Sequence, residues 1–66
     1  MTVYVIKNTE AEVLEICSSI NAAFTWLRTE LQVEGEFKVE RLNNHFVVEA
    51  GDESFVILEW TVFDQT

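Results

Sequence analysis

Apolar side chains occupy both alternating sets of positions in the last strand-like run of this chain, Phe55 to Phe63. Alternate residues of a β-strand point to opposite faces of a sheet. A small domain with one helix covers one face of a sheet, so this pattern predicts that another copy of the chain, or a partner protein, covers the second face. One set consists of Val56, Leu58, Trp60 and Val62, and the other of Phe55, Ile57 and Phe63 with Glu59 and Thr61.

The beginning of the chain predicts a β-hairpin. Thr2 to Lys7 is rich in valine, tyrosine and isoleucine, and Glu12 to Cys17 alternates as a second strand after a short turn. The alternation in the second strand places Val13 and Cys17 on one face, and Leu14 and Ile16 on the other.

A single helix follows, predicted to run to about Gln32, with Gly35 ending the unit. Either Ser18 or Ser19 can accept a hydrogen bond from the free amides at the helix start. Apolar residues recur along it at helical spacing and form one stripe, which Trp26 flanks: Ile20, Ala23, Phe24, Leu27 and Leu31.

The remainder predicts a three-stranded meander of Phe37 to Leu42, His45 to Ala50 and Phe55 to Phe63. Asn43-Asn44 and Gly51-Asp52 suit two-residue turns, because asparagine and glycine tolerate positive φ. Such turns fix the register and place one set of side chains together on the face assigned to the helix: Phe37, Val39, Phe46, Val48, Phe55 and Ile57. The opposite face carries Lys38, Glu40 and Glu49 towards one edge and Val47, Val56, Leu58, Trp60 and Val62 towards the middle.

Strands that are apolar on both faces belong in the centre of a sheet, so the first and last strands are expected to pair. The predicted fold is an α+β domain spanning residues 1–66, a five-stranded antiparallel sheet with one helix on one face (ββαβββ) and strand order 2-1-5-4-3. A chain this short is marginally stable alone and usually needs a disulfide, a metal or oligomerisation. With one cysteine and one histidine, the chain is expected to form neither an internal disulfide nor a metal cluster. Oligomerisation remains, and a homodimer is predicted.

The expected dimer interface is Val56, Leu58, Trp60 and Val62, with part of the first strand. If the helix covers that face instead, Phe37, Val39 and Phe55 become the interface.

Twelve acidic and four basic residues give a formal charge of −8, which opposes direct binding to nucleic-acid phosphates. It favours a basic partner, such as a nucleic-acid-handling protein, or serves solubility alone. Glu49 is expected opposite Lys38, and is partly neutralised there. The other meander carboxylates either solvate edges and loops or imitate a run of phosphates; the partner-binding candidates among them are Glu36, Glu40, Asp52 and Glu53.

The helix has few charges, Arg28 and Glu30, so its outer face is a candidate contact surface. Trp26 is either a partner contact, since tryptophan is enriched at binding hot spots, or a core residue over the sheet margin. No catalytic, cofactor-binding or metal-binding arrangement can be assembled. Cys17 is expected to be a small buried apolar residue and His45 a surface residue beside a turn.

The chain resembles small accessory proteins encoded by phages and prophages, of the anti-defence or anti-CRISPR type. The resemblance rests on a Val3-Tyr4-Val5-Ile6 strand, the run from Val13 to Ser19, alanine at 22 or 23, Trp26 in the helix, and the closing Glu59-Trp60-Thr61-Val62 strand. It departs from that pattern at Cys17, where an aromatic residue is usual. The resemblance implies an inhibitor of a host defence protein and carries over no catalytic residues.

The sequence therefore predicts a non-enzymatic binding protein that occludes a host protein as an acidic homodimer. The alternative is an accessory protein that acts only through homo-oligomerisation. No basic leader opens the chain, no apolar run approaches the ~20 residues of a membrane helix, and a lone thiol fits a reducing cytosol. A cytoplasmic protein is expected, in the host cytoplasm if a phage encodes it.

Overall fold

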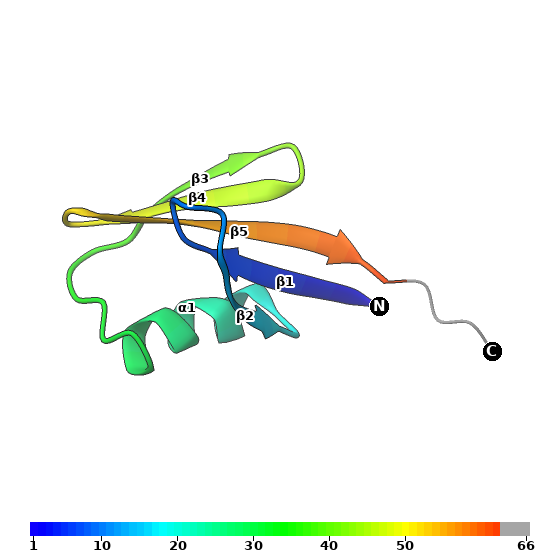
Figure 1. Cartoon of the computed structure of the whole chain (residues 1–66), viewed down its shortest axis with the longest axis horizontal. Helices are drawn as coiled ribbons and strands as arrows, with labels where there is room; N and C mark the ends of the chain where they lie inside the picture. Colours follow the sequence, from blue (N-terminus) through cyan, green and yellow to red (C-terminus); the bar gives the residue numbers. More distant parts are fainter. Residues whose placement is uncertain (63–66) are drawn as a thin grey trace.

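A computed structural model describes residues 1–62, in which one helix lies against one face of a five-stranded antiparallel sheet (Figure 1). The α+β fold and the strand order β2-β1-β5-β4-β3 confirm the sequence prediction. Among the described residues, no helix is long and apolar enough to cross a membrane. The elements are β1 (Thr2–Lys7), β2 (Val13–Cys17), α1 (Ile20–Thr29), β3 (Lys38–Leu42), β4 (His45–Ala50) and β5 (Glu53–Thr61).

Both turns of the meander are two-residue turns, as predicted. Leu42 pairs with His45 across the first turn, and Ala50 pairs with Glu53 across the second. Gly51 has a φ of 62°, a conformation that glycine adopts without steric cost. The expectation of positive φ at the asparagine turn is wrong: among the described non-glycine residues, positive φ occurs at Ala11 and Gln32.

The hydrophobic core lies between α1 and the sheet. The predicted helix face is confirmed, since Val48, Phe55 and Ile57 are buried there. Val39 shares that face through its pairing with Val48, but it is 46% exposed because α1 packs nearest to β1 and β2 and leaves β3 uncovered. The core residues are Ile6, Ala23, Leu27, Val33, Val48, Ala50, Phe55 and Ile57.

The helix begins at the predicted cap and ends earlier than predicted. The Ser19 side-chain oxygen accepts a hydrogen bond from the Ala22 amide at 3.0 Å. The last helical residue is Thr29 rather than Gln32, because the backbone turns at Gln32 with a φ of 54°. This turn brings Val33 into the core, where its amide donates to the Leu27 carbonyl at 3.0 Å.

A β-bulge in β2 overturns the predicted faces of that strand. Ile6 pairs with Glu15, yet Lys7 pairs with Val13, so Leu14 is an extra residue without an opposite partner. One inserted residue exchanges the two faces for every residue beyond it. Leu14 and Cys17 therefore pack against the core together, whereas Ile16 lies on the opposite face with Val5, its register partner. Sequence alternation had put Leu14 with Ile16, and Val13 with Cys17, and both pairings are wrong.

Candidate functional site

The sheet face opposite α1, here called the open face, is uncovered by any described residue. The strand register aligns one row of side chains across all five strands on this face: Leu42, His45, Leu58, Val5 and Ile16. The Val3–Trp60 pair continues the apolar surface towards the end of β5. Backbone hydrogen bonds between Met1 and Val62, at 2.7 and 2.9 Å, hold that end of the face in place.

A shallow apolar hollow of about 330 Å³ lies on the open face. Three of the predicted interface residues, Leu58, Trp60 and Val62, line it together; Val56 lies further along β5, opposite Lys7 and Val47. Trp60 is 57% exposed, a large fraction for the largest apolar side chain. The complete lining is Val3, Val5, Lys7, Ile16, Leu58, Trp60 and Val62.

Ile16 is an open-face residue that the sequence prediction missed. It is 56% exposed, although simple alternation from Leu14 would have placed it under the helix. No glycine or proline in the Val13–Cys17 run indicates the bulge that moves it. The sequence signal that could have indicated the bulge is Glu15, a charged residue at the centre of an otherwise apolar strand.

The open face has a balanced charge. The charged residues on it are Lys7, Lys38, Glu40 and Glu49, two of each sign, placed there by their pairing with Val56, Val47 and Ser54. The chain as a whole carries −8. The acidic excess therefore lies away from this face.

Much of that excess gathers at one end of the sheet, here called the acidic end. Three segments lie towards that end: the β1–β2 loop, the α1–β3 segment and the β4–β5 turn (Figure 1). Asn8 and Thr9 line one shallow hollow with Asp52 and Glu53, which brings the first segment against the third. The exposed carboxylates of these segments are Glu10, Glu12, Glu30, Glu34, Glu36, Asp52 and Glu53.

The four predicted acidic candidates do not form one cluster. Glu36, Asp52 and Glu53 belong to the acidic end, while Glu40 lies on the open face opposite Val47. The predicted Lys38–Glu49 register is confirmed. In the part of the chain that the structure describes, however, the ion pair is between Arg41 and Glu59, at 3.7 Å on the helix side of the sheet.

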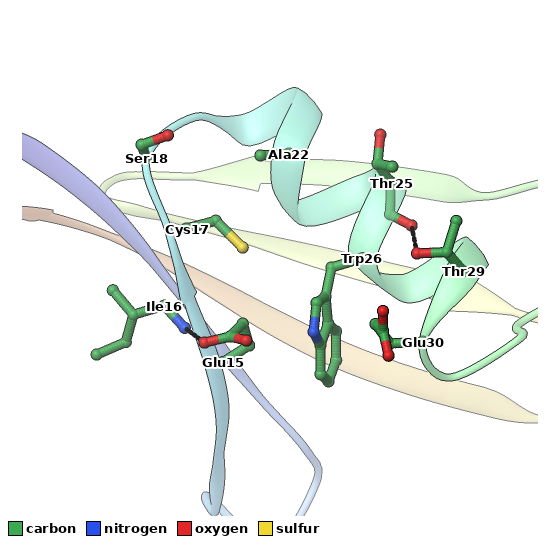
Figure 2. Close-up of a pocket in the computed structure, with 9 residues that line it drawn as sticks. All are labelled: Glu15, Ile16, Cys17, Ser18, Ala22, Thr25, Trp26, Thr29 and Glu30. Atoms are coloured by element: carbon green, nitrogen blue, oxygen red, sulfur yellow. Dashed lines mark hydrogen bonds between the residues drawn. The ribbon is translucent and has the colours of Figure 1, made fainter.

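Trp26 lies between α1 and the edge strand β2. Its indole packs against the core and lines a shallow hollow of about 510 Å³ beside Glu15, Cys17 and Glu30 (Figure 2). The side chain is therefore half-buried rather than fully outward, and one part remains available to a ligand. Two carboxylates beside an indole form a setting that suits a basic side chain.

The other chemically reactive groups have ordinary structural roles. Burial raises the pKa of the Cys17 thiol above its usual value, and the charge of Glu15 raises it further. Because the thiolate is the nucleophile, this shift opposes reactivity. The Glu15 carboxylate also accepts a hydrogen bond from the Ile16 amide at 2.9 Å (Figure 2), which occupies a backbone donor on the edge strand β2.

Within residues 1–62, no three or more histidine, cysteine, aspartate or glutamate side chains gather as a metal site. Comparison of the chain with protein-family models, with curated proteins and with solved structures finds no match. The candidate functional surfaces are therefore the open face, the acidic end and the hollow beside Trp26.

Proposed function

We propose that this protein is a small acidic binding protein without catalytic activity, which occludes a basic surface of another protein. The observation that carries the proposal is the acidic end, where three chain segments with exposed carboxylates lie towards one end of the sheet and two of them line one hollow. A dense group of carboxylates attracts lysine- and arginine-rich surfaces, and such surfaces are typical of proteins that handle nucleic acids. The acidic end then occupies the basic surface of the partner in place of nucleic-acid phosphates.

Trp26 extends the proposed contact. The hollow beside it offers an aromatic face with Glu15 and Glu30 at its sides. A lysine or arginine of the partner can stack on the indole and pair with a carboxylate, which combines cation–π and charge attraction. Trp26 would thus add apolar contact area to a largely electrostatic interface.

The resemblance to phage accessory proteins narrows the proposal to an inhibitor of a host defence protein, acting in the host cytoplasm. The residues that carry that resemblance include Trp26 in the helix, and Glu59 and Trp60 in the closing strand of this chain. The second candidate function is an accessory protein that acts only by self-association. The apolar open face favours that candidate, because it needs a cover whether or not a target exists.

The test compares two charge reversals of equal size. Glu36→Lys with Asp52→Lys alters the acidic end, and Glu40→Lys with Glu49→Lys makes the same change on exposed residues of the open face, away from the acidic end and the Trp26 hollow. Proteins captured from host lysate by the immobilised wild type and by both variants are quantified by mass spectrometry, at low and high salt. We expect a basic protein that the acidic-end variant loses and the control retains, and whose capture falls at high salt.

A second arm tests the mimicry directly. Duplex DNA should not bind the protein itself, and it should compete for the captured partner. Capture that is equal for both variants and insensitive to salt would contradict the proposed acidic contact. Direct binding of the purified protein to duplex DNA would contradict it as well.

A further inference from the structure

Exposed apolar side chains concentrate on the open face. Trp60, Ile16 and Val62 are 57%, 56% and 42% exposed, and they line one continuous hollow. Leu42 and Val13, which are 41% and 52% exposed, extend the same face through their register with His45 and Lys7. A contiguous apolar patch of this kind on a small protein marks an interaction surface.

The charge of the face identifies its occupant. Two copies of a chain with a charge of −8 repel each other on most of their surface. That repulsion is small on the open face, because Lys7 and Lys38 balance Glu40 and Glu49 there. A basic partner would gain more from the acidic end than from this neutral face. The surface is thus suited to another copy of itself.

The size of the face is sufficient for a stable dimer. Five strands about 4.8 Å apart, each of five to nine residues rising about 3.3 Å, make a face roughly 24 Å wide and 17–30 Å long. A standard interface takes about 800 Å² from each partner. The plan area of the face is about 410–720 Å², which reaches the lower part of the range of roughly 600–1,000 Å² per partner that stable interfaces bury.

We propose that a second copy of this chain covers the open face and forms a symmetric homodimer. In such a dimer the same patch meets itself about a two-fold axis, so Trp60 and Val62 of each subunit become buried. The second copy replaces, on this face, the cover that α1 provides on the other. The inference does not depend on the proposed target, since it concerns the purified chain alone.

Two matched valine substitutions provide the test. Val62 on the open face and Val39 on the helix side are 42% and 46% exposed, so Val62→Lys and Val39→Lys make the same chemical change at equal exposure. Sedimentation over a wide concentration range should show a dimer for the wild type and for Val39→Lys. The dissociation constant should rise roughly 30-fold or more in Val62→Lys, and also in Trp60→Lys, as expected for loss of an interface hot spot.

Tryptophan fluorescence supplies a readout that does not depend on disrupting the face. Trp26 and Trp60 are the two tryptophans, so a Trp26→Phe variant reports on Trp60 alone. As the protein is concentrated, the Trp60 emission should shift to shorter wavelength and iodide quenching should fall. A monomer at every concentration, growth beyond a dimer, or a Trp60 that stays accessible in the associated state would overturn the proposal.

Salt separates this inference from the proposed function. Dimerisation should strengthen at high salt, because salt screens the repulsion between two acidic chains and leaves apolar burial intact. Target capture should weaken under the same conditions. A dimer that forms while capture fails would contradict the proposed function alone, and capture by a protein that stays monomeric would contradict the dimer alone. Equal weakening of the dimer by Val39→Lys and Val62→Lys would refute the assignment of the face.

Discussion

Residues of β5 that point to opposite faces of the sheet have opposite environments. Ile57 is fully buried beneath α1, whereas Trp60 on the open face is 57% exposed. Both faces are apolar along the central strands β1 and β5, so composition does not distinguish them. The difference is that, within residues 1–62, a cover lies over one face only: a helix of ten residues that packs over β1 and β2. A strand that is apolar on both faces therefore leaves one apolar face exposed here, and that exposure is the reason for the proposed second copy.

The two faces also differ in how charge is arranged. On the helix side, Arg41 pairs with Glu59, and the Arg28 guanidinium lies 3.9 Å from the centre of the Phe37 ring. Arg28 is a residue of α1, so its contact with Phe37 extends the helix cover towards β3, while the Arg41–Glu59 pair joins β3 to β5. The open face has an apolar centre with balanced charges towards one end. That arrangement resembles the core and rim of a protein interface.

The largest expected difference between the faces concerns Ile57 and its neighbour Leu58. Ile57→Ala should lower the free energy of unfolding by about 2–5 kcal/mol, because it opens a cavity among fully buried side chains. Leu58→Ala should cost the monomer about 1–2 kcal/mol, less than Ile57→Ala, since the Leu58 side chain is only half-buried there. Urea denaturation at several protein concentrations measures both.

The concentration dependence sharpens this comparison. The loss from Ile57→Ala should be the same at every protein concentration, while that from Leu58→Ala should grow as the dimer becomes populated. A domain of this size has roughly 3–10 kcal/mol of stability, so Ile57→Val, at about 0.5–1.5 kcal/mol, replaces the alanine variant if that does not fold. Similar losses from the two sites at low concentration would contradict the difference between the faces.

A medium effect is expected within β2, where the bulge separates two apolar residues. Leu14→Ala should cost about 1–2 kcal/mol, about half the loss for a fully buried leucine, because Leu14 packs partly against the core. Ile16→Ala should change the stability of the monomer by less than about 0.5 kcal/mol, since Ile16 is 56% exposed. Equal losses would mean that both residues share a face, as alternation without a bulge predicts.

The fold was predictable where pattern and turn chemistry agreed. The two-residue turns fixed the register of Val39, Val48 and Phe55, and two-sided apolar strands placed β1 beside β5. The bulge was not predictable, because the run Val13–Cys17 reads as ordinary alternation and the extra residue is decided by the loop geometry. There the Asn8 side-chain oxygen accepts hydrogen bonds from the Glu10 and Glu12 amides, both at 2.9 Å, and Ala11 has a φ of 63°.

The candidate surfaces were predictable in part, for the same reasons. The shared face of Leu58, Trp60 and Val62 was predictable because alternate residues of one strand point to the same side of the sheet. The face of their neighbour Ile16 was not, since it depends on the bulge. The acidic end also depends on which loops meet in space. Glu10 and Glu12 are distant in sequence from Asp52, and strand order brings their loop beside the β4–β5 turn.

The smallest of these effects concerns the N-terminal cap of α1, the helix that covers one face of the sheet. Ser19→Ala should lower the free energy of unfolding by about 1 kcal/mol, because the Ala22 amide loses its side-chain acceptor at the start of α1. Ser18→Ala is the matched control, an exposed serine one residue earlier, and should change stability by less than about 0.5 kcal/mol. Thermal and urea unfolding measure both.

A third variant distinguishes capping from other roles of the serine. Ser19→Gly should cost only a few tenths of a kcal/mol, since glycine at a cap leaves the amides open to water. Fraying of the first turn would loosen Ala23, which is fully buried, and hydrogen exchange of the α1 amides should rise in Ser19→Ala. The helix-covered face would then begin to resemble the open one. The proposed role of the cap would be contradicted if Ser18→Ala and Ser19→Ala lowered the free energy of unfolding equally. Unchanged hydrogen exchange of the α1 amides in Ser19→Ala would contradict it as well.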